Sequence, residues 1–514
     1  MLKRVIVYFI APVFVVLIIL LMVLVFNTLS DKSTRPGNSA ISTIVLDKND
    51  LQAAEHRLSE AIRIKTLSHE LTSLQGKKIS RTFLNLLRTN YPNLHSDLKQ
   101  TVINEQSIIY HWPAPVSSNK SRPVLLLAHY DVVPVQGLNW QHPGFSGFND
   151  GQAIWGRGSL DNKSSLLAML EAIEILLRQG HSLNRDVYLA FGHDEESGGE
   201  LGAKKIAEYF ISQGLKFDMI LDEGLVVTEG VIDLVQQPVA LIGISEKGLL
   251  NLELSLEQKG GHASMPGKIT AVGQMSRALQ RLEENPLPAR LTYPVVTMLS
   301  RLAHKAKVMN RLVLSNLWLF RYFVIKKFNQ SPATHAAVNT TIVATQISAS
   351  NKINVLPTTV TANLNIRILP GDSIDSVQQH VRDTIGNPRI RLRVVDGAFE
   401  PAPMSMIDHD VYRQLERSIL QVYPDALVAP GLVLAATDSR HYRSLTERTY
   451  RFMPLRLTKQ DLSRIHGENE RILIQDYHRS IQFYWQLLMN IAVNQAEDLS
   501  QVDRVRNLAG YYQG

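Results

Sequence analysis

The distribution of apolar and polar residues divides the chain into segments of different kinds. Residues 5–26 form an uninterrupted apolar run, long enough as a helix to cross the hydrocarbon core of a bilayer. Residues 30–43 are rich in Ser, Thr, Pro and Gly and show no apolar period, which is typical of a flexible tether. From Leu51 the apolar residues recur at helical spacing, and a second helical pattern starts at Phe83 and ends before Pro92. A folded unit therefore begins after the tether with two helices.

Short apolar runs then alternate with a long helical pattern. Residues 124–128, 187–191 and 219–221 have the length and composition of buried strands. The helical stretch 165–178 separates the first two of them. This alternation predicts the fold class α/β, with the strands gathered in one sheet.

The pattern changes at residue 249. Residues 249–256 alternate between apolar and polar side chains, which favours a strand with one exposed face, and residues 360–368 form a similar run. We expect an α+β domain between them, inserted into the larger α/β domain. Its middle, residues 299–328, combines Leu, Trp and Phe with Lys and Arg in a basic amphipathic pattern. This segment either packs on its own domain, which the pattern favours, or contacts the bilayer or acyl chains.

The N-terminal apolar run has two interpretations, an anchor or a cleaved signal peptide. The run exceeds a usual signal-peptide core and no small-residue cleavage site follows it, so we predict an anchor. Lys3 and Arg4 precede the run, which indicates a cytoplasmic N-terminus and an extracytoplasmic remainder. The predicted segments are the transmembrane anchor 5–27, the linker 28–45, the α/β domain in two parts 46–248 and 368–496, the inserted domain 249–367 and the tail 497–514.

Composition limits the chemistry. The chain has no cysteine, so any metal must be bound by His, Asp and Glu, and disulfides are excluded. The formal net charge is +7, but Lys and Arg are scattered and accompany no nucleic-acid-binding motif. We therefore expect no nucleic-acid partner.

Acidic residues and histidines follow the predicted strands. The carboxyl ends of strands in an open α/β sheet meet at one edge, where reactive groups collect. The residues after the strands are His129, Asp131, Glu195, Glu196 and Asp222. Asp161 follows from a glycine-rich loop, and His466 lies far downstream. An HxD triplet or a Glu-Glu pair alone is usually a solvated turn, but together these residues predict a metal site.

The residue types suit two metal ions. Two divalent ions that share a carboxylate polarise a carbonyl group and activate water. Asp131 can accept the second N–H of His129 and so fix its tautomer. In the adjacent Glu195 and Glu196, one carboxylate can bind metal while the other acts as a general base.

Three motifs resemble one known family. Residues 127–134 (LAHYDVVP), 155–163 (WGRGSLDNK) and 465–470 (IHGENE) are similar to motifs of the zinc metallopeptidase family that contains carboxypeptidase S (Gly-X carboxypeptidase), N-acyl-amino-acid hydrolases and aminoacylase. The resemblance extends from about residue 50 to residue 494. It implies a mixed-sheet dizinc peptidase domain with an inserted lid or dimerisation domain.

The resemblance also implies roles for the candidate residues. Asp161 would bridge two Zn²⁺ ions per subunit, with His129 and Asp222 completing one site and Glu196 and His466 the other. By the same resemblance, Glu195 would be the general base and Asp131 would orient His129.

Further implied roles lie in the inserted domain. His262, in residues 260–266, matches a histidine that stabilises the oxyanion and that many dimeric relatives supply from the partner subunit, so a homodimer through the lid is possible. Asn354 and Arg367 match positions that grip a substrate carboxylate, and a guanidinium suits that role. Residues 437–441 resemble an active-site loop of the family.

These expectations converge on a membrane-anchored hydrolase. Its substrate would be a small peptide or an N-acyl amino acid, cleaved at the amide bond next to a free carboxylate. The alternatives are an aminoacylase or desuccinylase acting on one metabolite, a non-catalytic scaffold that retains the fold, and an aminopeptidase. An aminopeptidase would need an acidic group for the substrate ammonium, whereas Arg367 is basic.

Overall fold

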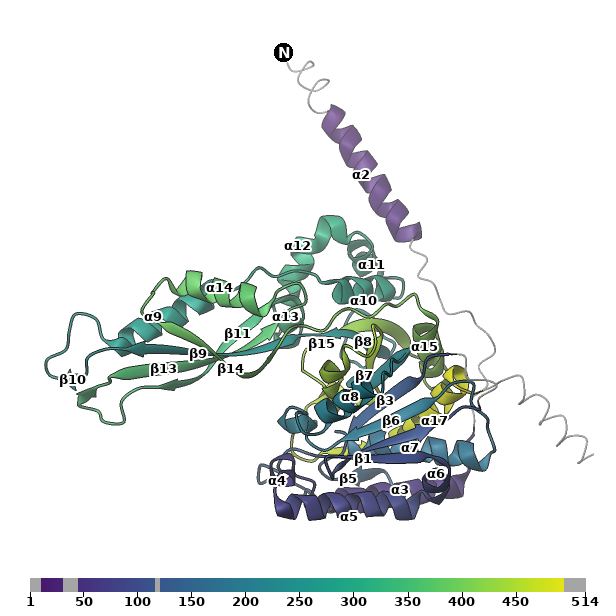
Figure 1. Cartoon of the computed structure of the whole chain (residues 1–514). Helices are drawn as coiled ribbons and strands as arrows, with labels where there is room; N and C mark the ends of the chain where they lie inside the picture. The colour runs from purple at the N-terminus through teal and green to yellow at the C-terminus, as the bar shows by residue number, and fades with distance from the viewer. Residues whose placement is uncertain (1–10, 31–44, 116–120, 494–514) are drawn as a thin grey trace, which may run out of the picture.

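The computed structural model describes residues 11–30, 45–115 and 121–493. A larger α/β unit carries an elongated arm, and the single helix α2 (Ala11–Ser30) projects from the region between them (Figure 1). Helix α2 is long and apolar enough to cross a membrane. Lys3, Arg4, most of the predicted linker and the tail lie outside the described residues.

The α/β unit is built on a sheet of eight strands in the order β1-β2-β6-β3-β7-β16-β8-β15. Neighbouring strands β6, β3, β7 and β16 are parallel, whereas β1, β2 and β6 pair antiparallel, so the sheet is mixed as predicted. The strands are β1 (Lys99–Ile103), β2 (Ser107–Trp112), β3 (Val124–His129), β6 (Val187–Gly192), β7 (Met219–Glu229), β8 (Val239–Glu246), β15 (Leu427–Val433) and β16 (Thr449–Thr458).

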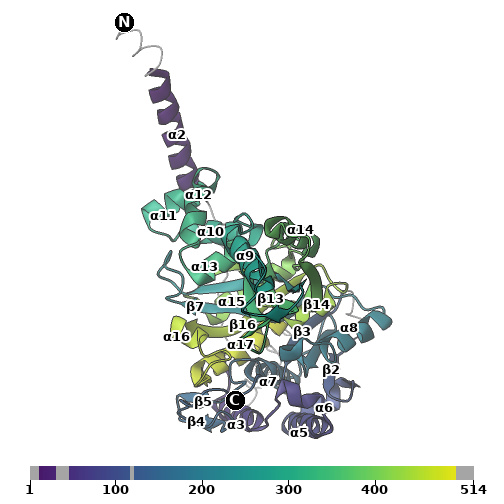
Figure 2. The ribbon, with the colours of Figure 1, turned by 90° about the vertical axis from the view of Figure 1, so that its left-hand side faces the viewer.

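The central strands are buried on both faces, which explains their continuous apolar runs. In β3, Val124 and Leu126 pack in the main core, and Leu125 and Leu127 pack on the opposite face against α8. The two faces are covered by different helices (Figures 1 and 2). The helices of this unit are α3 (Lys48–Arg63), α4 (Ser68–Leu71), α5 (Leu74–Asn90), α6 (Pro92–Asp97), α7 (Lys163–Arg178), α8 (Ala203–Ser212), α15 (Asp410–Val422), α16 (Lys459–Leu462) and α17 (Ile474–Ile491).

Local sequence signals set the ends of the first helices. The side chain of Asp47 accepts the backbone N–H of Asn49 at the start of α3, and Ser73 caps α5 in the same way. Helix α5 ends at Asn90, two residues before Pro92, because the residue before a proline disfavours helical geometry. The predicted pair of N-terminal helices is confirmed, although α5 begins at Leu74, nine residues before the predicted start at Phe83.

The arm consists of a four-stranded antiparallel sheet in the order β11-β13-β9-β14, covered by two helices. Its central strand β9 turns Leu250, Leu252, Leu254 and Leu256 into the arm core, as the alternation predicts. Two of its elements, β14 and α14, lie beyond the predicted boundary at residue 367. The arm elements are β9 (Gly248–Glu257), α9 (Ala271–Glu284), β11 (Thr341–Ser348), β13 (Thr359–Ile368), α14 (Ile374–Ile385) and β14 (Arg391–Phe399), with β10 (Gly261–His262) and β12 (Val355–Leu356) at its tip.

Residues 293–338 form a helical layer at the base of the arm. The basic segment 299–328 folds as several short helices whose inner residues share one cluster, including Leu314 and Val324. The helices are α10 (Tyr293–Ala303), α11 (Val308–Leu314), α12 (Leu317–Phe328) and α13 (Pro332–Val338). Helix α10 also packs on the α/β sheet through Leu302, which contacts Val239 and Ala429.

A small sheet brings two distant loops together. Strand β17 (Arg471–Leu473) pairs with β5 (Ala153–Trp155), which pairs with β4 (Phe148–Asn149). Asp161 lies six residues after β5 and His466 five residues before β17, so this pairing places both at the same edge of the larger sheet. Two 3₁₀ turns, η2 (Glu195–Ser197) and η3 (Asp438–Tyr442), lie at that edge as well.

Candidate metal centre

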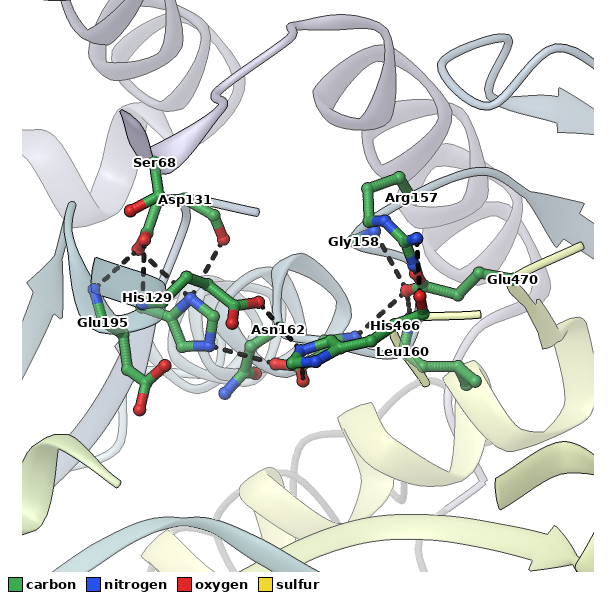
Figure 3. Close-up of polar contacts among 12 residues, drawn as sticks. Ser68, His129, Asp131, Arg157, Gly158, Leu160, Asn162, Glu195, His466 and Glu470 are labelled. Carbon is green, nitrogen blue, oxygen red and sulfur yellow. Dashed lines mark hydrogen bonds and ion pairs between the residues drawn. The ribbon is translucent and has the colours of Figure 1, made fainter. Parts of the chain in front are cut away.

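His129, the last residue of β3, is the centre of a buried polar cluster (Figure 3). Its Nε2 lies 3.0 Å from Oδ1 of Asp161 and 3.3 Å from Oε2 of Glu223. Its Nδ1 lies 3.0 Å from the backbone oxygen of Asp131 and 3.3 Å from Oδ1 of its carboxylate. With the proton on Nδ1, the imidazole donates to Asp131 and turns the Nε2 lone pair toward the other two carboxylates.

The Asp131 carboxylate also fixes the predicted glutamate pair. It accepts the backbone N–H groups of Glu195 and Glu196, both at 3.1 Å, and so holds the 3₁₀ turn η2 against the end of β3 (Figure 3). The carboxylate is fully buried and positions three candidate side chains at once. Burial alone would raise the pKa of Asp131, but its contact with His129 and its hydrogen bonds lower it.

His466 forms the other half of the cluster. Its Nε2 lies 3.1 Å from Oδ2 of Asp161 and 3.0 Å from Oε1 of Glu196. Asp161 therefore turns one oxygen to each histidine, which is the arrangement of a carboxylate that bridges two ions. Oε1 of Glu196 is buried against His466 and has lone pairs to offer to a cation.

The third strand end carries the predicted ligand Asp222 and a second acidic residue, Glu223. Both oxygens of Asp222 accept backbone N–H groups, from Glu223 at 2.9 Å and from Ser439 at 2.7 Å. The neighbouring Glu223 reaches His129 instead, and three donors that lie within 4.8 Å of one another come from His129, Glu195 and Glu223. Glu223, the residue after the predicted ligand Asp222, is therefore a further candidate ligand at this strand end.

A local irregularity in β7 brings Glu223 beside His129. Asp222 pairs with Arg451 and Leu225 with Phe452, so the two residues between them have no partner in β16. Gly224 has a φ of 143°, a backbone conformation that favours glycine. The bulge turns Glu223 to the sheet edge, whereas a regular strand would alternate the two acidic side chains between opposite faces.

The carboxyl groups of the cluster lie close together, and this changes the pKa values of the acids and histidines. Burial, with the charge of Glu223, raises the pKa of Glu195 well above its usual range, and burial raises the pKa of Glu223 to about 8. Hydrogen bonds to Asp161 and Glu196 raise the pKa of His466 to about 10. For His129, burial would lower the pKa, but the surrounding carboxylates raise it well above normal. Protons thus compensate the negative charge where no cation is bound.

The donor set fits two divalent ions. Besides the group around Glu223, a second group of donors within 4.8 Å of one another comes from His129, Asp161 and Glu196. The donors are imidazole nitrogen and carboxylate oxygen, which suit zinc and other borderline or hard divalent ions. A cation pair would replace the protons that the crowded carboxylates otherwise retain.

The cluster lines one part of a cavity of about 820 Å³. Basic residues line the same cavity: Arg367 from the arm, and Arg440 and Arg443 from the turn η3 and its end. The Arg367 side chain forms no hydrogen bond or ion pair with another described residue. Phe399 lies beneath two of these guanidinium groups, which are 4.9 and 5.8 Å from its ring. The basic η3 side chains were not predicted individually.

Two predicted residues lie away from this cavity. His262 is in β10 at the tip of the arm, and Asn354 is beside it, with its backbone oxygen accepting the N–H of Ala263 (Figure 1). His262 is exposed, and its Nδ1 contacts Ser264. Within the described part of the chain, neither side chain lines the cavity with Arg367.

Glu470 supports the candidate metal cluster, but the positions of the candidate ligands in the sequence did not predict it. Its Oε1 accepts the backbone N–H groups of Gly158 at 2.9 Å, Leu160 at 2.8 Å and Asp161 at 3.3 Å (Figure 3). The carboxylate therefore fixes the glycine-rich loop that carries Asp161. Burial raises the pKa of Glu470 to about 7. Its position four residues after His466, in one of the quoted motifs, was the available signal.

The sequence matches the model of Peptidase family M20/M25/M40 over residues 125–490. The chain belongs to this family. All residues of the metal cluster fall within the matched region. M20 enzymes are metal-dependent peptidases and related hydrolases, so the chain is a metallo-hydrolase that acts on peptides or acyl-amino acids.

Curated relatives of two kinds match this M20 chain over most of its length. It is 37% identical to "Probable carboxypeptidase S-like 2" of Dictyostelium discoideum over 485 residues, 92% of each chain. It is 33% identical to the human N-fatty-acyl-amino acid synthase/hydrolase, covering 94% of this chain and 97% of that one. Carboxypeptidase S of Saccharomyces cerevisiae is 27% identical, with coverage of 88% and 86%.

Solved structures share the fold. An M20 family metallo-carboxypeptidase from Sulfolobus solfataricus superposes with a TM-score of 0.63 at 19% identity, covering 86% of this chain and 99% of that one. Human carnosine dipeptidase 1 gives a TM-score of 0.58 at 15% identity, with coverage of 87% and 99%. At these identities the likeness establishes the α/β fold with its attached smaller sheet.

Proposed function

We propose that this M20 chain hydrolyses the amide bond next to a free carboxylate, in small peptides or in N-acyl amino acids. The observation that carries the proposal is the unpaired guanidinium of Arg367 in the cavity that also contains the metal cluster. Burial and the charge of Arg440 lower the pKa of Arg367, but a guanidinium remains charged at neutral pH. A substrate carboxylate is the partner that fits such a group, because it accepts two parallel N–H bonds.

The residues divide the work between binding and proton transfer. His129, Asp161, Glu196, Glu223 and His466 would hold two Zn²⁺ ions, which supply Lewis acidity for the scissile carbonyl and lower the pKa of water. Asp131 holds His129 in the tautomer that leaves Nε2 free. No side chain forms a covalent intermediate in this scheme.

Glu195 is the proposed general base. Its carboxylate lies in the cavity wall, and its backbone is fixed by Asp131. It takes a proton from the attacking water while the water oxygen bonds to the amide carbon. It then gives that proton to the amine nitrogen as the C–N bond breaks, so the products are a carboxylic acid and an amine.

The proposal includes location and assembly. Helix α2 would cross the membrane once, with the N-terminus in the cytoplasm because Lys3 and Arg4 precede it and the hydrolase unit outside. The exposed His262 at the arm tip would reach the cavity of a second copy and stabilise the oxyanion there. Asn354, beside it, would contact the same substrate.

The test is amine release by the full-length, zinc-loaded protein in detergent. The panel pairs dipeptides and short- and long-chain N-acyl amino acids with their carboxamide counterparts, which lack the free carboxylate. We expect cleavage of the free acids only, and its loss in Glu195→Gln. Arg367→Gln should raise KM for the acids with a smaller change in kcat.

Two outcomes would contradict the proposal. Equal cleavage of acids and carboxamides would mean that no group in the cavity recognises the carboxylate, as in an aminopeptidase. Equal inactivity of the wild type and Glu195→Gln, with both metals bound, would favour the scaffold alternative.

A further inference from the structure

The outer face of α11 and α12 exposes large apolar side chains. On α12, Trp318, Tyr322 and Phe323 are 57%, 68% and 64% exposed. They recur at i, i+4 and i+5, so they share one side of the helix, opposite the buried Val324. The same hairpin also exposes the large apolar side chains of Val308, Met309 and Leu319. Soluble proteins rarely expose apolar side chains in one contiguous group of this kind unless the surface contacts a partner.

The hairpin is also strongly basic. Residues 285–371 contain no Asp or Glu, so no acidic side chain of the segment neutralises its Lys and Arg. The exposed cations of the hairpin region form no ion pair with another described residue; they are Lys305, Lys307, Arg321, Lys326 and Lys327. A surface that combines aromatic rings with unpaired cations is complementary to an anionic lipid interface.

Helix α2 contacts this hairpin directly. The amide of Asn316, which is fully buried between α11 and α12, accepts a hydrogen bond from Nδ2 of Asn27 at 2.9 Å. Its own Nδ2 donates to the backbone oxygen of Leu24 at 3.2 Å and lies 3.4 Å from the hydroxyl of Thr28. Figure 2 shows α2 rising from the hairpin. These hydrogen bonds all come from the C-terminal part of α2.

This contact determines where the hairpin lies relative to the bilayer. A helix of 20 residues rises about 30 Å, the thickness of the hydrocarbon core, so the C-terminal end of α2 lies at a bilayer surface if α2 spans the membrane. Asn316 joins the hairpin to that end. The exposed aromatic residues of the hairpin are therefore at the level of the lipid headgroups, where Trp and Tyr side chains are most stable.

We propose that the outer face of the α11–α12 hairpin, residues 308–328, lies in the headgroup layer of the leaflet at the C-terminal end of α2. Its rings enter the acyl boundary, and its lysines and arginines contact anionic headgroups. This inference rests on the proposed membrane span of α2 and goes beyond hydrolysis. The inner face of the hairpin packs in the protein, as predicted, but the outer face is a lipid contact.

Because the chain lacks cysteine, single cysteines can be introduced and labelled without removing others. Tyr322→Cys, Leu21→Cys in the middle of α2 and Ile353→Cys at the arm tip would carry the same small fluorophore. All three side chains are exposed in the structure. Each full-length protein would be placed in nanodiscs at one chain per disc, which excludes contact with a second copy.

Brominated lipids quench a label within the bilayer, and iodide quenches a label in water. We expect brominated lipids to quench the labels at 21 and 322 several-fold more strongly than the label at 353, with iodide showing the reverse order. Quenching at 21 but not at 322 would overturn the hairpin proposal while leaving the span intact. Absence of quenching at 21 would refute the span itself. Shielding of 322 from iodide only at two chains per disc would assign the surface to a second copy.

The cations provide an independent measurement. In discs that contain anionic lipid, Arg321→Glu, Lys326→Glu and Lys327→Glu together should weaken the quenching at 322 several-fold, since each lysine or arginine near an anionic surface adds attraction. In discs of neutral lipid the same substitutions should change it little. An equal effect in both lipids would contradict contact with anionic headgroups.

Discussion

Arg157 and Glu470 form an ion pair that is inaccessible to solvent, with side-chain exposures of 1% and 0%. The guanidinium of Arg157 also donates to the backbone oxygens of His466 at 3.0 Å and Gly467 at 3.1 Å. Because Glu470 fixes the backbone around Asp161, this pair joins the two loops that carry Asp161 and His466 (Figure 3).

The first prediction follows from that pair. Glu470→Gln leaves the buried guanidinium without its charge partner and weakens the support of both loops, so we expect a lower melting temperature. We also expect metal affinity to fall by about ten- to hundredfold, the range typical of residues that support metal ligands. Glu468→Gln is the matched control, because that carboxylate is on the same loop and accepts the exposed N–H of Asn139. Equal metal titrations for the two variants would show that the ion pair does not support the site.

The second prediction separates the neighbours Asp222 and Glu223. Glu223→Gln should lower the metal content from about two ions per chain to about one, since a neutral amide is a poorer ligand. Asp222→Asn should retain both ions, because its oxygens accept backbone N–H groups and an amide oxygen can still accept one of them. Metal analysis after dialysis measures the difference, with Glu229→Gln on the same strand as control. The reverse result would return the ligand role to Asp222.

A third prediction concerns pH in the chelated protein. The folded-state pKa of His466 is raised to about 10 from an ordinary value of 6.5, so the folded chain binds more protons than the unfolded chain between these values. The stability that this histidine contributes is therefore complete below pH 6.5 and is lost as pH rises toward 10. Thermal melts across that range should fall more steeply for the wild type than for His466→Gln.

The same proton must leave when metal binds. Zinc requires the neutral imidazole, so metal uptake at pH 7 should release protons and affinity should increase with pH. Calorimetry in two buffers with different ionisation enthalpies counts the released protons. If the melting temperatures of the wild type and His466→Gln changed equally with pH, and metal uptake released no protons, His466 would already be neutral in the metal-free protein.

The fourth prediction tests whether His262 acts in a second copy. His262→Ala and Glu195→Gln should each be nearly inactive alone. After subunit exchange in an equal mixture, one site in each mixed dimer has both residues, so activity should recover to about a quarter of the wild-type value. Rate assays before and after exchange provide the measurement. No recovery, despite mixed dimers detected by native mass spectrometry, would place His262 in the cavity of its own chain.

The sequence predicted the sheet well because its signal is local. The runs that became β3, β6 and β7 are buried on both faces, and a continuous apolar run between turns needs no tertiary information to be recognised. Strand direction then placed His129 and the glutamate pair at one edge. Arg367 lines the same cavity as the glutamate pair.

Other features depend on tertiary contacts. The bulge at Gly224, which brings Glu223 beside His129, depends on the pairing of β7 with β16, because two residues of β7 have no partner there. The end of the arm was missed because β14 has no fully buried residue and so lacks an apolar period. The partnership of Arg157 with Glu470 joins positions 313 residues apart, and no local pattern encodes it.

The position of β16 in the sheet has a consequence for biosynthesis. This strand lies between β7 and β8, although it is made more than 200 residues after them. The arm sheet, by contrast, is contiguous from Gly248 to Phe399 and is complete before β16 leaves the ribosome. The nascent chain therefore holds a finished arm and an open α/β sheet at the same time. His466 follows β16, so the candidate metal cluster is completed only among the last events of folding.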